Sequence, residues 1–147
     1  MPNRKINVSC NTTYQVMSIH RTSHWKHHLV YVLKADKPIR YPMDRSKIAY
    51  IGETSSGKRR PAGSAASKAE RSFGKLHGVR RLDVHIVTCK GKQRVKTWEE
   101  LERGLLATFL ELFGRLPKYN KQCRKLKTSD VRLFSKSRLR SIVKGLS

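Results

Sequence analysis

The sequence predicts an α/β domain built on a small three-stranded, mainly antiparallel β-sheet that is flanked by helices. Two runs of β-branched and aromatic residues, 29–33 and 48–51, are typical of strands. The segment 64–76 is rich in Ala, Lys, Glu and Arg, which favours a helix, and the alternating run 82–89 indicates a third strand. The expected order is therefore strand, strand, helix and strand, followed by two more helices.

The segment 97–113 gives the strongest helix signal in the chain. Its apolar residues recur at helical spacing, and Thr97 with Glu100 three residues later matches a capping box. Gly114 and Pro117 follow the last apolar residue, which is typical of the end of a helix. We therefore expect a helix that has Thr97 as its N-cap and ends before Gly114.

A last, basic helix is expected over 128–144, with Ser129 as its cap. It belongs to the tail 122–147, which we expect to form one compact unit with the main domain, 28–121. Residues 1–27 are expected to be an N-terminal extension, because their scattered apolar positions match neither a strand nor a helix clearly.

Two stretches are expected to be connections, 34–47 and 53–63, because they combine proline with closely spaced charged or small residues. The second follows Gly52 and matches the phosphate-binding pattern GxxxxGK as far as Lys58. A P-loop needs Ser or Thr at the next position to hold magnesium, and this chain has Arg59 there. We therefore interpret the stretch as a basic loop and not as a nucleotide site.

The chain is strongly basic, with 33 Lys and Arg residues against 10 Asp and Glu and a formal net charge of +23. Such a charge predicts a polyanionic partner, because each neutralised phosphate releases condensed cations and adds affinity. Aromatic residues make up 7% of the chain without an RNA-stacking signature, so we expect DNA in preference to RNA. The side chains expected to contact nucleic acid are Lys58, Arg59, Lys68, Arg71, Asn120, Arg138 and Arg140.

The cysteines and the apolar runs disfavour other classes of protein. Cys10, Cys89 and Cys123 are far apart and odd in number, and no zinc-site spacing occurs. No apolar run has the length of a signal-peptide core or a membrane span, and the segment 128–144 has too thin an apolar face to insert. We therefore expect a soluble cytoplasmic protein, as in a bacterial or phage-infected cell, with no membrane partner.

Glu102 is an acid in an unfavourable place. At about 100° per residue, it falls near the middle of the apolar arc of the helix 97–113. A carboxylate on an apolar face costs free energy unless it is paired with a cation or hydrogen-bonded. It is either part of a structural salt bridge to an arginine or a metal ligand at the floor of an active-site cleft. We prefer the metal ligand.

Five short motifs follow one another within residues 28–121. They are Leu29-Val30-Tyr31, Tyr50-Ile51-Gly52, Arg60 eight residues beyond Gly52, Glu102 followed by Leu105-Leu106, and Pro117-Lys118-Tyr119-Asn120. In this order, and on the secondary structure expected here, they resemble the motifs of the GIY-YIG nuclease superfamily.

The chain departs from the family's pattern at three points. Its first motif keeps only the tyrosine, and the nineteen-residue separation of Tyr31 from Tyr50 is longer than in most members. Ser64 stands one helical turn after Arg60, where many members have a histidine. The sequence leaves open which residue takes the place of that histidine, the candidates being His77, His85 and Tyr41.

The resemblance implies a metal-dependent endonuclease with four catalytic residues, Tyr31, Tyr50, Arg60 and Glu102. One divalent ion, Mg²⁺ or alternatively Mn²⁺, would be held by Glu102 and act as a Lewis acid. Arg60 would clamp phosphate oxygens with its fixed, always charged donors. One tyrosine, with Tyr31 preferred, would position or deprotonate the attacking water. This role needs positive charge nearby, because an unperturbed phenol titrates at about pH 10.

The alternative function is non-catalytic nucleic-acid binding, by a decayed nuclease or by a basic RNA- or DNA-binding module. Glu102 separates the two hypotheses, because a protein that only binds a polyanion gains nothing from an acid aimed at it. The recognition site and the strandedness of the substrate stay open, as does the oligomeric state, a homodimer included.

Overall fold

A computed structural model describes residues 28–54, 59–76, 78–89, 96–121, 126 and 133–147, and of Arg59 and Arg60 it describes the backbone alone. The predicted α/β class, the three-stranded antiparallel sheet and the order of the elements are confirmed. The elements are β1 (Leu29–Arg40), β2 (Arg45–Thr54), α1 (Arg59–Lys75), β3 (Leu82–Val87), α2 (Thr97–Phe113) and α3 (Lys136–Leu146).

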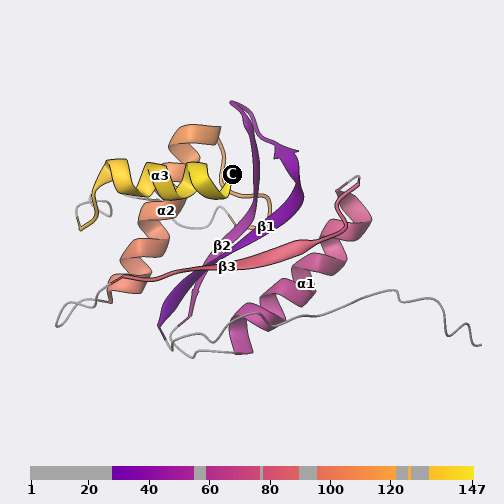
Figure 1. Ribbon diagram of the computed structural model, residues 1–147, viewed down its shortest axis with the longest axis horizontal. Helices are drawn as coiled ribbons and strands as arrows, with labels where there is room; N and C mark the ends of the chain where they lie inside the picture. Colours follow the sequence, from indigo (N-terminus) through magenta and orange to yellow (C-terminus); the bar gives the residue numbers. More distant parts are fainter. Residues whose placement is uncertain (1–27, 55–58, 77, 90–95, 122–125, 127–132) are drawn as a thin grey trace, which may run out of the picture.

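The sheet has the order β2-β1-β3, with α1 on one face and α2 and α3 on the other (Figure 1). Alternate residues of β1 serve the two faces, as the period of a strand requires. Val30 and Val32 belong to the main core, which α2 and α3 cover. Tyr31 and Leu33 belong to a smaller cluster on the α1 face. The two sides therefore have separate interiors.

The β1–β2 hairpin is longer than predicted. The stretch 34–47 is not a connection, because β1 continues to Arg40 and β2 begins at Arg45 after a short turn. In the sequence, Pro38 argued against a strand at this place, because proline cannot donate a ladder hydrogen bond. The register between the strands shifts from the pair Lys34 and Ile48 to the pair Ile39 and Ser46, so the proline falls in the irregular part of the ladder.

The predicted start of α1 and the predicted N-cap of α2 are wrong, whereas the predicted start of α2 at residue 97 is confirmed. Helix α1 begins at Arg59, not at residue 64, and Pro61 lies in its first turn, where no intrahelical N–H bond is required. The N-cap of α2 is Lys96, without a side-chain cap, and Thr97 is the first helical residue, so the predicted capping box is absent. The predicted end of α2 is confirmed, because Gly114 is left-handed with φ of 74°.

Helix α3 begins later than predicted. Its cap is Ser135, whose side chain accepts a hydrogen bond from the Arg138 N–H, and the predicted cap Ser129 lies outside the described residues. The helix packs on α2 at Gly104, where an added Cβ would lie 3.1 Å from Leu139 Cδ1. Glycine therefore sets the close approach of the two helices. No helix in the described part of the chain is long and apolar enough to cross a bilayer.

Candidate active site

Gly52 makes room for two tyrosine rings on the α1 face of the sheet. It lies opposite Tyr31 in the β1–β2 ladder, and Tyr50 lies opposite Leu33. The ring centroids of Tyr31 and Tyr50 are 5.8 Å apart. A methyl group on the Gly52 α-carbon would lie 2.6 Å from Tyr50 Cε1 and 2.9 Å from the Tyr31 hydroxyl oxygen. A side chain at this position would therefore displace the rings.

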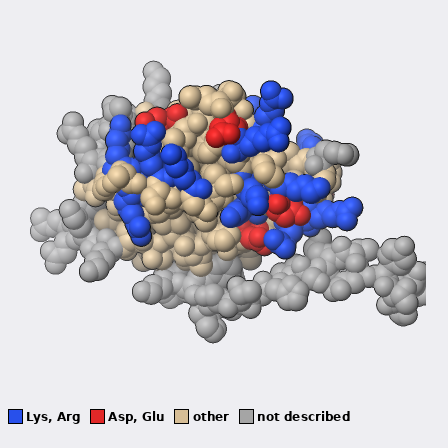
Figure 2. All heavy atoms as spheres, turned by 45° about the horizontal axis from the view of Figure 1, so that its top comes forward, with Lys and Arg blue, Asp and Glu red and all other residues tan. Residues whose placement is uncertain are grey.

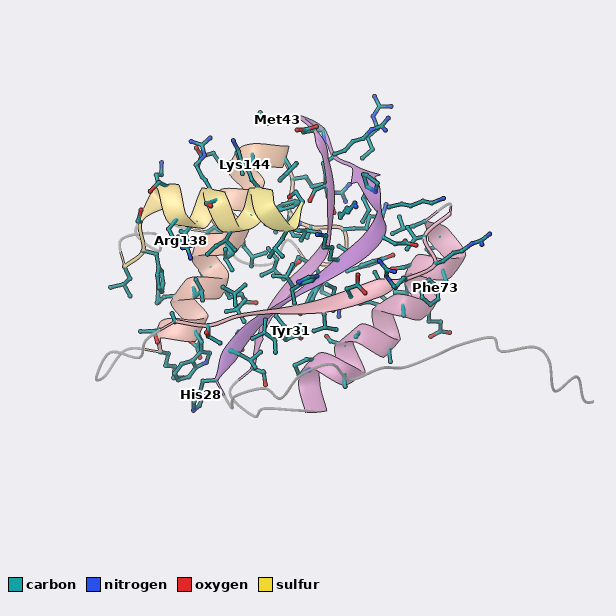
Figure 3. The ribbon with its side chains drawn as sticks, viewed as in Figure 1. His28, Tyr31, Met43, Phe73, Arg138 and Lys144 are labelled. Atoms are coloured by element: carbon teal, nitrogen blue, oxygen red, sulfur yellow. The ribbon has the colours of Figure 1, made fainter. Side chains whose placement is uncertain are left out.

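The Tyr31 hydroxyl is directed toward α1, as its place between the sheet and that helix indicates (Figure 3). It donates a hydrogen bond to Ser64 Oγ at 3.1 Å. Lys68 Nζ donates to the same oxygen at 3.0 Å and lies 4.0 Å from the centroid of the Tyr50 ring. One ammonium group therefore acts on both tyrosines, through a hydroxyl in one case and over a ring face in the other.

The side of α1 that faces the sheet is polar, whereas a helix that covers a sheet normally turns apolar residues inward. Ser64, Lys68 and Ser72 follow at four-residue intervals, and Ser72 is fully buried. Ser72 Oγ lies 3.1 Å from the Tyr119 hydroxyl. Phe73, by contrast, is 42% exposed on the outside of the helix. The role of the two serines was missed from the sequence, although their spacing around Lys68 was a usable signal.

Asn120 closes the outer edge of β2 beside the second motif. Its Oδ1 accepts the Ile51 N–H at 3.0 Å, and its Nδ2 donates to the Ile51 carbonyl at 2.7 Å. Next to it, the Tyr119 N–H donates to the Ala49 carbonyl at 3.0 Å. The segment therefore pairs with the free edge of β2. Both ends of the Asn120 amide bond to backbone, which positions the strand of the second motif, and its contact with nucleic acid stays a prediction.

The first turns of α1 and α2 flank the same end of the sheet, where β1 begins and β2 ends (Figure 1). Trp98 stacks on His28, with ring centroids 4.3 Å apart. Helix α1 begins five residues after Thr54, the last residue of β2. Arg60 in the first turn of α1 and Glu102 one turn after Trp98 therefore belong to the two sides of this end. The Arg60 side chain lies outside the described residues.

Glu102 is half-buried at the edge of the buried face of α2, and the prediction that it lies at the centre is wrong. The contact between Gly104 and Leu139 turns the helix toward α3, so Leu110 is 40% exposed. Glu102 interacts with neighbouring groups and is not an isolated charge. The buried residues of α2 are Thr97, Leu101, Gly104, Leu105, Thr108, Phe109 and Phe113.

The predicted nucleic-acid contacts do not share one face. Arg71 is exposed on α1, whereas Arg138 and Arg140 are exposed on α3, across the sheet (Figure 3 labels Arg138). Lys58 and the side chain of Arg59 lie outside the described residues. On the face shown in Figure 2, Lys and Arg side chains form separate groups with uncharged surface between them. A long polyanion fits this distribution better than a single small anion does.

Two of the candidates for the missing histidine lie on the wrong face. Tyr41 is buried beneath α2, where its hydroxyl donates to the Ile48 carbonyl at 2.7 Å and accepts the Lys118 N–H at 3.1 Å. This burial raises the pKa of Tyr41 to about 12. His85 points to the same face of the sheet. His77 lies outside the described residues. At the position of the missing histidine, the described group that contacts Tyr31 is therefore Ser64 itself.

Among the described residues, no three His, Cys, Asp or Glu side chains come together as a metal-binding group. Within the described residues, at most two such side chains would therefore hold a divalent ion together. Mg²⁺ commonly uses one or two carboxylates with waters and substrate phosphates as its remaining ligands, and the half-buried Glu102 fits that mode.

No family model matches the chain, and comparisons with curated proteins and with solved structures find no match either.

Proposed function

We propose that the protein is a metal-dependent DNA endonuclease of the GIY-YIG type. The observation that carries the proposal is the packing beside Gly52. Because this residue has no side chain, the rings of Tyr31 and Tyr50 lie there next to the Lys68 ammonium group. Tyrosines that serve packing alone need no such arrangement. Phosphodiester hydrolysis requires further groups, and three elements supply them. They are the second strand with its glycine, the arginine in the first turn of α1 and the glutamate on α2.

Tyr31 orients the attacking water through its hydroxyl. Ser64 and Lys68 stabilise the negative charge that develops on the phenol oxygen, since Lys68 donates to the hydroxyl that contacts Tyr31. Arg60 neutralises the phosphoryl oxygens with its planar set of donors. Asn120 holds the strand of the second motif in place through its two hydrogen bonds to Ile51.

Glu102 would hold the divalent ion, with Mg²⁺ preferred and Mn²⁺ as the alternative. Its side chain is half-buried, and hard divalent cations favour oxygen ligands. When bound, the ion supplies Lewis-acid stabilisation of charge on the phosphate. The four proposed catalytic residues act together at the end of the sheet that α1 and α2 flank. They are Tyr31, Tyr50, Arg60 and Glu102.

Plasmid cleavage tests the proposal. Supercoiled DNA and single-stranded DNA are incubated with the full chain in Mg²⁺, in Mn²⁺ and in EDTA. We expect nicked or linear products with either metal and none in EDTA. Unaltered DNA under all conditions, from protein that is folded by circular dichroism, would refute the nuclease.

The net charge of +23 also supports a second function, non-catalytic nucleic-acid binding. In that case the protein retards the same plasmid in a gel but leaves it uncut in both metals. The single plasmid experiment therefore separates the two candidates.

A further inference from the structure

A basic hollow lies at the turn of the β1–β2 hairpin, at the opposite end of β1 from His28. Its lining consists of Arg40, Tyr41, Pro42, Arg115 and Lys118. Three of these five residues are cations and none is an acid. All three cations are exposed, so their charged groups are open to a ligand from solvent.

Hydrogen bonds between three segments of the chain fix the walls of the hollow. The Met43 N–H donates to the Phe113 carbonyl at 3.2 Å, which ties the turn to the end of α2. The Lys118 N–H donates to the Tyr41 hydroxyl at 3.1 Å, and that hydroxyl donates to Ile48. The cations therefore come from the turn, from the end of α2 and from the segment after it, and the backbone holds them together.

Within the described part of the chain, Arg40, Arg115 and Lys118 take part in no ion pair. The Asp44 Oδ1 in the same turn accepts a hydrogen bond from the Arg45 N–H at 2.7 Å. At the end of α2, the Leu110 and Phe113 carbonyls accept backbone hydrogen bonds from Gly114 and Met43. Three like charges around one hollow favour an anionic ligand.

We propose that this hollow binds a phosphate group of the nucleic-acid backbone, as an anchor separate from the candidate active site. Arginine matches phosphate oxygens with a planar pair of donors, and lysine adds a mobile point charge. The inference rests on the nucleic-acid binding within the proposed function and is independent of cleavage.

The distance between the two sites suits duplex DNA. Tyr31 and Tyr41 are ten positions apart along the hairpin, which corresponds to at most about 33 Å along a strand. Figure 3 shows Tyr31 and Met43 toward opposite ends of the hairpin. Duplex DNA rises about 3.4 Å per base pair, so a separation of this size corresponds to about ten base pairs.

Charge-matched variants test the anchor. One full-length variant carries Arg40→Gln, Arg115→Gln and Lys118→Gln. The control carries Lys37→Gln, Arg80→Gln and Lys136→Gln, three exposed cations outside the hollow. Fluorescence anisotropy with a 20-base-pair duplex is measured over a range of salt concentrations, after melting curves have shown that both variants fold.

We expect the hollow variant to bind roughly tenfold more weakly than the parent and to lose about one unit or more of its log–log salt slope. The control should lose less than about threefold. Equal losses in both variants would overturn the anchor, because only total charge would then matter. If the parent itself does not bind DNA, the proposed function fails as well, so the two failures are distinguishable.

Protection of the Lys118 amine gives an independent readout. The parent is treated with an amine-acylating reagent and digested for mass spectrometry, with Lys37 as the internal reference. The duplex should slow acylation of Lys118 severalfold relative to Lys37, and inorganic phosphate at the same phosphate concentration should not. Equal protection by free phosphate would assign the hollow to small anions and overturn the backbone anchor, as would the absence of protection by the duplex.

Discussion

Gly52 and Tyr31 face each other across the β1–β2 ladder so closely that one methyl group on the glycine would lie 2.9 Å from the tyrosine hydroxyl oxygen. Both residues are buried, and the tyrosine ring fills the space beside the glycine. A glycine in the interior of a strand often marks such a close approach.

The first prediction concerns this close approach. Gly52→Ala should lower the free energy of unfolding by about 1–3 kcal/mol, because the new methyl group overpacks against two rings. It should also abolish cleavage. Gly63→Ala is the control, since it has nothing within 4 Å on α1 and should stabilise the protein by about 0.5–1 kcal/mol. Urea unfolding of both variants measures the contrast, and a neutral Gly52→Ala would contradict the described ring positions.

The second prediction concerns the contact from Lys68 to the tyrosines. Lys68→Met keeps most of the side chain but removes the ammonium group from Ser64 and from the Tyr50 ring. The cleavage rate should fall by about 10²-fold or more, as for other groups that assist proton transfer. Lys75→Met removes one exposed cation from the end of the same helix and should change the rate only slightly. If the cleavage rate falls only slightly in both variants, Lys68 contributes general attraction of DNA and no specific effect on the tyrosines.

The third prediction concerns Asn120. Asn120→Ala leaves both backbone groups of Ile51 without their partner at the edge of β2. We expect a loss of about 1–3 kcal/mol in the free energy of unfolding. Lys121→Ala, at the exposed neighbouring position, should have little effect. Thermal melts of the two variants give the comparison, and equal melting temperatures would show that the edge contacts contribute nothing.

The fourth prediction is the pH dependence that Tyr41 brings to stability. Burial raises its pKa from 10.0 to about 12, so the folded state favours the protonated phenol. The resulting stability is complete below pH 10.0 and is lost as the pH rises toward about 12. Across this interval the loss should amount to about 2–3 kcal/mol. Tyr41→Phe should show a shallower decline in urea titrations at alkaline pH. Parallel curves for parent and variant would assign the alkaline loss to other groups.

The fifth prediction is that Glu102→Gln folds normally and does not cut. The amide has nearly the shape of the carboxylate but is a poorer ligand for a hard divalent cation. DNA binding should stay equal or become tighter, since one negative charge is removed. Glu99→Gln, which breaks only a pair with Lys96 at 3.3 Å, should keep its activity. A Glu102→Gln protein that is destabilised by about 3–5 kcal/mol would instead indicate a structural salt bridge. One that nicks plasmid at the parental rate would exclude Glu102 as the metal ligand.

Sequence patterns predicted the elements well where one physical signal dominated. The strands around Tyr31 and Tyr50 and the end of α2 at Gly114 are examples, because side-chain periodicity and a left-handed glycine act locally. Pro38 concealed the length of the hairpin, since only the paired register shows that the proline falls in its irregular part.

The candidate site was predictable only in part. Its tyrosines and Glu102 were identified from motifs, but the side of α2 that is buried depends on the contact of Gly104 with Leu139, which is far away in sequence. The polar contact of Ser64 with Tyr31 is likewise a product of tertiary packing. No local pattern specifies such contacts.

The candidate site depends on hydrogen bonds between residues that are far apart in the sequence, and this affects when the site can form during synthesis. Tyr31 bonds to Ser64, which is 33 residues later in the chain, and Ile51 bonds to Asn120, which is 69 residues later. Contacts of such long range form late, because the entropy of closing the intervening chain must be overcome first. A nascent chain therefore displays the positive charge of its first half before Asn120 has left the ribosome. Under the proposed function, we expect the chain to attract nucleic acid before it has the geometry to cut it.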